Sequence, residues 1–199
     1  FAQSWLARAV AAFVERHPAV AVDLQVSSQA VNLVEERIDL ALRITNQLDP
    51  NLIARRLATC HSVLCAAPAY LAQYGTPQTL ADLQNHRCIP IRERDQDFGR
   101  WELHGPAGVA AIKVSGPLSA NNGEIVRQWA IDGHGIILRS AWDVAPSIRK
   151  GRLVRILPEY EQEAHVWAVY PARLSSSAKV RIFVEFLEQW LAEQGVARA

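Results

Sequence analysis

The 199-residue sequence has no excess of charge of either sign, because 21 Lys and Arg residues are matched by 20 Asp and Glu residues. Surfaces that hold nucleic-acid phosphates have clustered positive charge, so the balance argues against nucleic-acid binding by this chain itself. No apolar run approaches the ~18–20 residues needed to cross a bilayer. The N-terminus also lacks the pattern of a signal peptide. These absences predict a cytoplasmic protein without a membrane partner.

Cysteine is scarce, and the three cysteines form no C-x-x-C pair. We interpret Cys60, Cys65 and Cys88 as reduced, mostly buried thiols. The dipeptide Cys60-His61 leaves open a redox sensor or a metal site, but zinc needs further ligands at suitable spacing and the sequence offers none. We therefore expect neither a metal nor a cofactor.

Catalytic motifs are missing as well. The sequence contains no G-x-S-x-G, H-E-x-x-H, P-loop or G-x-G-x-x-G. The glycine-rich stretch 133–135 is too short to cradle a phosphate, and we interpret it as a helix cap. The acidic residues Glu93, Asp95 and Asp97 alternate with arginines, which favours a solvated loop over a metal site. We expect no enzymatic activity.

Hydrophobic periodicity predicts alternating helices and strands. Helices are expected over 1–17, 29–36, 69–74, 79–85, 123–132, 141–149 and 178–193. Strands are expected over 20–26, 38–43, 52–57, 62–67, 87–91, 101–103, 109–114, 136–138, 153–157 and 165–170. This rhythm favours right-handed crossovers, and hence an α/β fold with mostly parallel sheets flanked by helices.

The predicted elements fall into two blocks. Residues 1–88 plus 168–199 are expected to form lobe I, and residues 89–167 to form lobe II. The chain would then cross between the lobes near 88–92 and again near 166–171. Two crossings allow a hinge, and a cleft between lobes is a preferred ligand site. Because the chain begins inside a helix, we also expect that it lacks an N-terminal part.

Groups suited to a small anion stand at predicted strand ends. Ser27-Ser28 and Asn121-Asn122 each precede a predicted helix, whose free N–H groups and positive dipole end favour anions. Arg43 ends the strand over 38–43 and can bind a carboxylate with two hydrogen bonds, and Thr45 adds a hydroxyl. The alternative is that these residues only cap helices, while Arg43 pairs with a structural carboxylate.

Several segments, in this order and spacing, resemble the effector-binding (substrate-binding) domain of LysR-type transcriptional regulators. They are FVERHPAVAVDL at 13–24, LVEERIDLALRI at 33–44, ARRL at 54–57, VLCAAPAYL at 63–71, TPQTLADLQNHRCI at 76–89, IDGHGIIL at 131–138 and GRLVRILP at 151–158. The resemblance implies a bacterial, two-lobed domain of the periplasmic-binding-protein-like type 2 fold. The winged helix-turn-helix of such regulators would be absent from this chain.

The resemblance also implies a function. Such a domain binds a small effector between its lobes, associates as a homodimer or homotetramer, and controls DNA binding through the N-terminal domain. The implied effector contacts are Ser27, Ser28, Arg43, Ile44, Thr45, Asn121, Asn122 and Ile136. The anion-binding groups favour an organic or aromatic acid. An extracytoplasmic solute-binding receptor of a transport system, or an enzyme on the same scaffold, are the alternatives.

Overall fold

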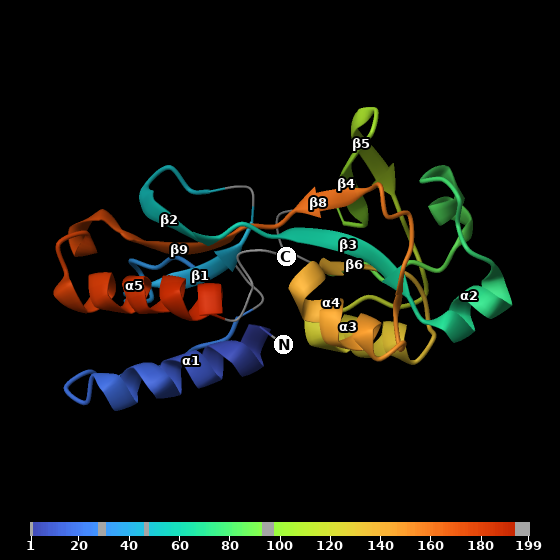
Figure 1. Cartoon of the computed structure of the whole chain (residues 1–199). Helices are drawn as coiled ribbons and strands as arrows, with labels where there is room; N and C mark the ends of the chain where they lie inside the picture. Colours follow the sequence, from blue (N-terminus) through green and yellow to red (C-terminus); the bar gives the residue numbers. More distant parts are fainter. Residues whose placement is uncertain (1, 28–30, 46–47, 93–97, 194–199) are drawn as a thin grey trace. The chain divides into compact units, whose positions relative to one another are not determined.

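The structure is a computed structural model that describes residues 2–27, 31–45, 48–92 and 98–193 (Figure 1). The chain divides into unit 1, Phe1–Cys60 and Ala164–Ala199, and unit 2, His61–Glu163. The chain therefore crosses twice between the two units. The first crossing lies after Cys60 and not near 88–92, so residues 61–88 belong to unit 2. The second lies slightly earlier than the predicted range 166–171.

Unit 1 is built on a three-stranded antiparallel sheet in the order β1-β9-β2. Its strands are β1 (Ala41–Ile44), β2 (Leu52–Ala58) and β9 (Val166–Pro171), and a short 3-10 turn, η2 (Ala172–Leu174), follows β9. The helices α1 (Ala2–Arg16) and α5 (Ala178–Glu193) lie on the same side of this sheet (Figure 1). Phe13 of α1 fixes their contact, because its ring lies 4.7 Å from that of Phe183 and 5.3 Å from that of Phe186.

The segment between α1 and β1 differs from the prediction. Residues 20–26 form no strand, and Val26 is 60% exposed. Residues 31–38 form hydrogen-bonded turns, closed by Glu36 N–H donating to the Asn32 carbonyl, where a helix over 29–36 was expected. A segment of alternating apolar and polar residues forms a strand only when a neighbouring strand pairs with it. Within the described residues, residues 20–26 have no such neighbour.

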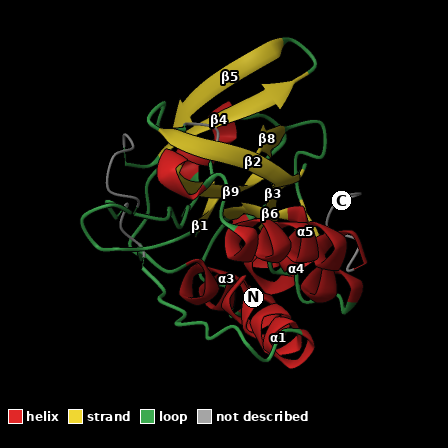
Figure 2. Ribbon diagram, turned by 90° about the vertical axis from the view of Figure 1, so that its left-hand side faces the viewer, coloured by secondary structure: helices red, strands yellow, loops and turns green. Residues whose placement is uncertain are grey.

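Unit 2 contains the larger sheet, in the order β5-β4-β8-β3-β6, with β7 also beside β3. The strands are β3 (His61–Ala66), β4 (Arg100–Gly105), β5 (Gly108–Lys113), β6 (Ile137–Ser140), β7 (Val154–Arg155) and β8 (Glu161–Glu163). Figure 2 shows β4 and β5 as the hairpin predicted around residues 105–108. Because β3 pairs with β6, β7 and β8, the residues that follow Cys60 join this unit.

The expectation of mostly parallel sheets is wrong for the described strands. All their ladders are antiparallel, and parallel pairing among them is limited to the isolated bridges Cys88–Ile136 and Ile91–Ala120. The expectation rested on a strand–helix–strand repeat over 20–43, and the first strand and the helix of that repeat do not form. The two-lobed α/β class does not depend on this detail.

Helices pack on both faces of the unit 2 sheet, α2 (Pro68–Tyr74) and the 3-10 helix η1 (Ala81–Asn85) in one core cluster and α3 (Gly123–Ile131) and α4 (Ala141–Arg149) in the other. Strand β3 is buried on both faces: Leu64 packs in one core cluster with Trp101, while Val63 packs in the other with Val126 of α3 and Val144 of α4. This two-sided burial explains why the run over 62–67 is apolar at successive positions.

Candidate functional site

Arg43 occupies the third position of β1, opposite Trp167 of β9. Its Nη2 donates to the carbonyl of Val31 at 3.1 Å, and the side chain is partly buried. With the residues that the structure describes, Arg43 makes no ion pair. The alternative of a structural carboxylate partner therefore gains no support from them, and the guanidinium keeps hydrogen-bonding groups for a ligand.

The backbone fixes Thr45 directly beyond β1. Its N–H donates to the carbonyl of His165 at 3.3 Å, and its own carbonyl accepts from the indole Nε1 of Trp167 at 3.0 Å. Ile44 lies between Arg43 and Thr45, so its side chain points to the opposite face of the sheet, where it is 44% exposed. Ser27 is exposed, and Ser28 lies outside the described residues. Arg43 and Thr45 thus lie close together at the end of β1.

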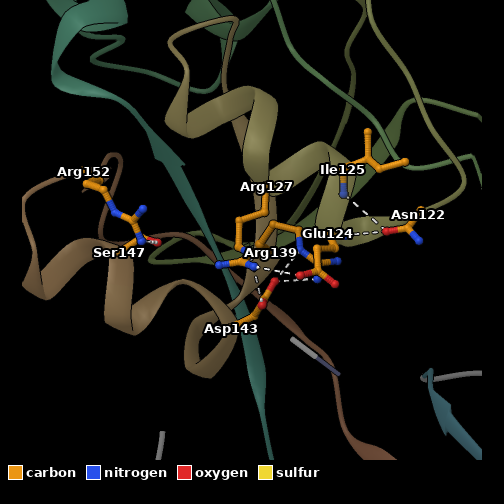
Figure 3. Close-up of polar contacts among 8 residues, drawn as sticks. All are labelled: Asn122, Glu124, Ile125, Arg127, Arg139, Asp143, Ser147 and Arg152. Atoms are coloured by element: carbon orange, nitrogen blue, oxygen red, sulfur yellow. Dashed lines mark hydrogen bonds and ion pairs between the residues drawn. The ribbon is translucent and has the colours of Figure 1, made fainter. Parts of the chain in front are cut away.

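Asn122 caps α3 in unit 2. Its side-chain Oδ1 accepts from the N–H groups of Glu124 at 2.8 Å and Ile125 at 3.3 Å (Figure 3). Asn122 therefore caps α3, which is the alternative role that the sequence analysis left open for it. This orientation turns the Nδ2 amide away from the helix, and Nδ2 donates to no group among the described residues. Asn121, directly before it, is exposed.

Ile136 has a different environment from the other candidates. Its side chain is completely buried in the hydrophobic core of unit 2. Its N–H donates to the Arg87 carbonyl, and its carbonyl accepts from Ile89, both at 2.9 Å. These contacts give Ile136 a role in packing and in bridging two chain segments.

A charged cluster that the sequence analysis missed lies beneath the N-terminus of α3. Asp143, which is 1% exposed, accepts from Nε of Arg139 at 2.9 Å, and Nε of Arg127 lies 3.5 Å from its other oxygen (Figure 3). A Cβ on Gly123 would come within 2.2 Å of Nη1 of Arg139. Glycine therefore lets the first residue of α3 rest directly on the guanidinium.

Arg92 is a second residue that the sequence analysis did not select. Its N–H donates to the Ala120 carbonyl at 2.8 Å, its Nη2 reaches Oγ of Ser119 at 3.4 Å, and its guanidinium lies 4.7 Å from the ring centroid of Phe98. The dense charge of residues 92–100 predicts a solvated loop there. The acidic residues 93, 95 and 97 of that loop lie outside the described residues.

The cysteines are free and buried. Burial raises the pKa of the Cys60 thiol to about 11 and that of Cys65 and Cys88 to about 12. The thiols are therefore protonated and poorly nucleophilic at neutral pH. Over the described part of the chain, no group of three or more His, Cys, Asp or Glu side chains is arranged to hold a metal ion. In the same residues, no helix is long and apolar enough to cross a membrane.

The two units, each with its own sheet and core, define an α/β domain of the two-lobed, periplasmic-binding-protein-like class. The family model for the LysR substrate binding domain matches residues 1–192. The chain belongs to this family. The resemblance described for the sequence is thereby confirmed.

The relatives are transcriptional regulators. The chain is 51% identical over 193 residues to the HTH-type transcriptional regulator DmlR of Escherichia coli K12 and 43% identical over 194 residues to the HTH-type transcriptional activator TtdR of the same strain. These alignments cover 97% and 98% of this chain and 63% of each relative. The chain thus spans less than two thirds of their length. Because these relatives are transcriptional regulators, a regulatory role is favoured over that of a transport receptor.

Solved regulatory domains have the same fold. The regulatory domain of CrgA, a LysR-type transcriptional regulator from Neisseria meningitidis, is 31% identical, with a TM-score of 0.79, over 92% of this chain and 90% of that one. The regulatory domain of AphB from Vibrio vulnificus is 25% identical, with a TM-score of 0.74, over the same shares.

Proposed function

We propose that this chain is the ligand-sensing regulatory domain of a cytoplasmic LysR-type transcription factor and that its effector is a small organic or aromatic acid. The main evidence that the effector is an acid is Arg43. Its guanidinium lies at the end of β1, is partly buried, and among the described residues is paired only with a carbonyl. A carboxylate would supply the missing countercharge through charge-assisted hydrogen bonds.

The other proposed contacts stand in both units. Thr45 lies beside Arg43 and accepts a hydrogen bond from Trp167. The Nδ2 group of Asn122, which donates to none of the described residues, offers a donor at the N-terminus of α3. Ser27, Ser28, Ile44, Asn121 and Ile136 complete the proposed set from the family resemblance. Because Ile136 is buried in the core, the proposal does not depend on its side chain.

The response to the effector is a shift between arrangements of the units that already exist without it. Such a shift requires the acid to bind one arrangement more tightly than the other. We propose that DNA binding belongs to a part of the protein beyond this chain, since the relatives are HTH-type regulators and are longer. Self-association as a homodimer or homotetramer would transmit the shift to that part.

Thermal unfolding against a panel of small organic and aromatic acids tests the function. A ligand at a hundredfold excess over its Kd stabilises the folded state by about 2.7 kcal/mol, or about 5–10 °C in Tm for a chain of this size. We expect at least one acid to raise the Tm, and Arg43→Ala to abolish the rise without unfolding the free protein.

The matched control is Arg100→Ala, which removes an arginine whose exposed ion pair with Glu102 lies in β4 of unit 2. This variant should keep the full rise in Tm. If no acid shifts the wild-type Tm, the proposed ligand class is wrong. If Arg43→Ala unfolds without ligand, Arg43 is a structural residue and the proposed site loses its main contact.

A further inference from the structure

Three residues share one rung of the unit 1 sheet. Trp167 of β9 stands opposite Arg43 of β1 on one side and opposite Arg56 of β2 on the other. Residues directly opposite each other in antiparallel strands point to the same face. Arg43, Trp167 and Arg56 therefore form a continuous row, which we call the Arg-Trp-Arg rung, across all three strands.

The rung lies on the face of the sheet away from the helices. Arg55, the neighbour of Arg56, points to the opposite face, where its Nε and Nη2 donate to the two carboxylate oxygens of Glu188 in α5, both at 2.6 Å. Both helices of unit 1 lie on that side (Figure 1). Two adjacent arginines thus have opposite environments: Arg55 is neutralised by a carboxylate, and Arg56 is not.

Trp167 holds Arg56 in place. The guanidinium carbon of Arg56 lies over the indole ring, 5.9 Å from its centre, which is within the ~6 Å limit of a cation–π contact. The ring is itself fixed, because its Nε1 donates to the Thr45 carbonyl. A guanidinium stacked on a ring keeps the N–H groups at its edges for a planar anion. Arg56 forms no ion pair with any described residue.

The rung therefore concentrates two positive charges without a carboxylate from the described residues. The Cα atoms of Arg43 and Arg56 are separated by two strand spacings, about 10 Å, and both side chains are long enough to converge on one small molecule. We propose that Arg56, seated on Trp167, is a second anion-binding residue beside Arg43, and that this face of the sheet selects an organic acid with two acidic groups. The inference rests on the proposed function and gives its ligand a more specific class.

Isothermal titration calorimetry on the 199-residue chain tests the inference in a buffer free of carboxylate and phosphate. The probes are straight-chain dicarboxylates from succinate to pimelate, each compared with the monocarboxylate of the same chain length. We expect at least one dicarboxylate to bind about tenfold or more tightly than its matched monocarboxylate, because a second charge-assisted contact forms. Arg56→Gln should remove this preference while leaving the monocarboxylate affinity unchanged.

Arg55→Gln is the control, since it makes the same change of charge one residue away on the opposite face. It should leave the preference intact. Trp167→Phe keeps an aromatic face but removes the indole donor, and it should abolish any change in tryptophan fluorescence on titration with the dicarboxylate. Arg56→Lys keeps the positive charge, so it should retain part of the preference for the dicarboxylate that Arg56→Gln loses.

An unchanged preference in Arg56→Gln, or equal losses in Arg55→Gln and Arg56→Gln, would overturn the second anion-binding residue and leave the acid site at Arg43 standing. The same holds if monocarboxylates or aromatic acids raise the Tm while no dicarboxylate shows a preference. If no acid of any class binds or raises the Tm, the proposed function itself fails, and this inference fails with it.

Discussion

At the scale of single residues, buried charge is the main feature that sequence patterns did not reveal. Asp143 is almost completely buried, and its carboxylate is surrounded by the guanidinium groups of Arg139 and Arg127. Arg139 precedes α4 and Asp143 lies in its first turn, so the pair spans the boundary between a strand and a helix. Burying one charge without its partner is costly, which makes this cluster a support for the turn at Gly123.

Asp143→Ala should lower the free energy of unfolding by about 3 kcal/mol, because it leaves the mostly buried Arg139 guanidinium without its carboxylate. Urea denaturation of the variant and the wild type measures the difference. Glu102→Ala is the matched control: it breaks the exposed pair with Arg100, and its effect should stay below about 1 kcal/mol. Equal effects of the two substitutions would show that the buried cluster contributes no more than a surface ion pair.

Arg43 and Arg139 share a signal that could have been read in the sequence. Each is the third residue of a short strand, in ALRI of β1 and in ILRS of β6. Arg43 is a candidate in the sequence because it ends a predicted strand and because the family resemblance covers it, whereas Arg139 was not selected. What the sequence could not supply is the partner: a carbonyl for Arg43 and a buried carboxylate for Arg139. These contacts depend on tertiary packing, which local spacing does not fix.

At the scale of elements, α3 connects the fold to the candidate site. Asn122 satisfies two N–H groups of its first turn and presents Nδ2 outward. Asn122→Ala should therefore lower the free energy of unfolding by about 1 kcal/mol, within the usual range of 0.5–2 kcal/mol for a lost cap. Urea denaturation provides the measurement.

Asn122→Asp separates the two roles of this side chain. Aspartate retains the cap, and its charge suits a helix N-terminus, so stability should be close to that of the wild type. It replaces the outward amide donor with an acceptor of negative charge, so the Tm rise caused by an acid should shrink. A full rise in Asn122→Asp would mean that Asn122 only caps the helix.

Elements with a complete amphipathic stripe were predictable. The expected helix over 178–193 is α5, and the expected helices over 1–17 and 123–132 match α1 and α3 to within a residue. The largest failure lies between residues 20 and 38, where period-2 alternation favoured a strand. Strand β8 was also not predicted, and the strand expected over 87–91 is present only as isolated bridges at Cys88 and Ile91. Alternation identifies a segment that can pair, but pairing also requires a neighbour, and the described residues provide none for 20–26.

At the scale of the whole molecule, the two-lobed class could be predicted from the sequence, but the residue at which the chain first passes from unit 1 to unit 2 could not. The apolar run over 62–67 was recognised as a strand without any indication of which sheet it joins. In the structure β3 lies within the sheet of unit 2, between β8 and β6. Strand order is a long-range property, so a boundary drawn from local blocks placed β3 in the wrong unit.

Family membership, and an Arg43 that has no carboxylate partner among the described residues, together make ligand sensing the central claim. Sensing requires more than binding, because a ligand with equal affinity for both arrangements of the units would change nothing. The acid must therefore alter the arrangement of unit 1 and unit 2, and Arg43→Ala must prevent the change.

Small-angle X-ray scattering of the 199-residue chain, with and without a saturating acid that raises its Tm, tests this claim most directly. We predict that the acid changes the scattering profile and radius of gyration of the wild type at several protein concentrations, and that Arg43→Ala shows no change. Identical profiles for the free and acid-saturated wild type would contradict the account, because the chain would then bind a ligand without responding to it.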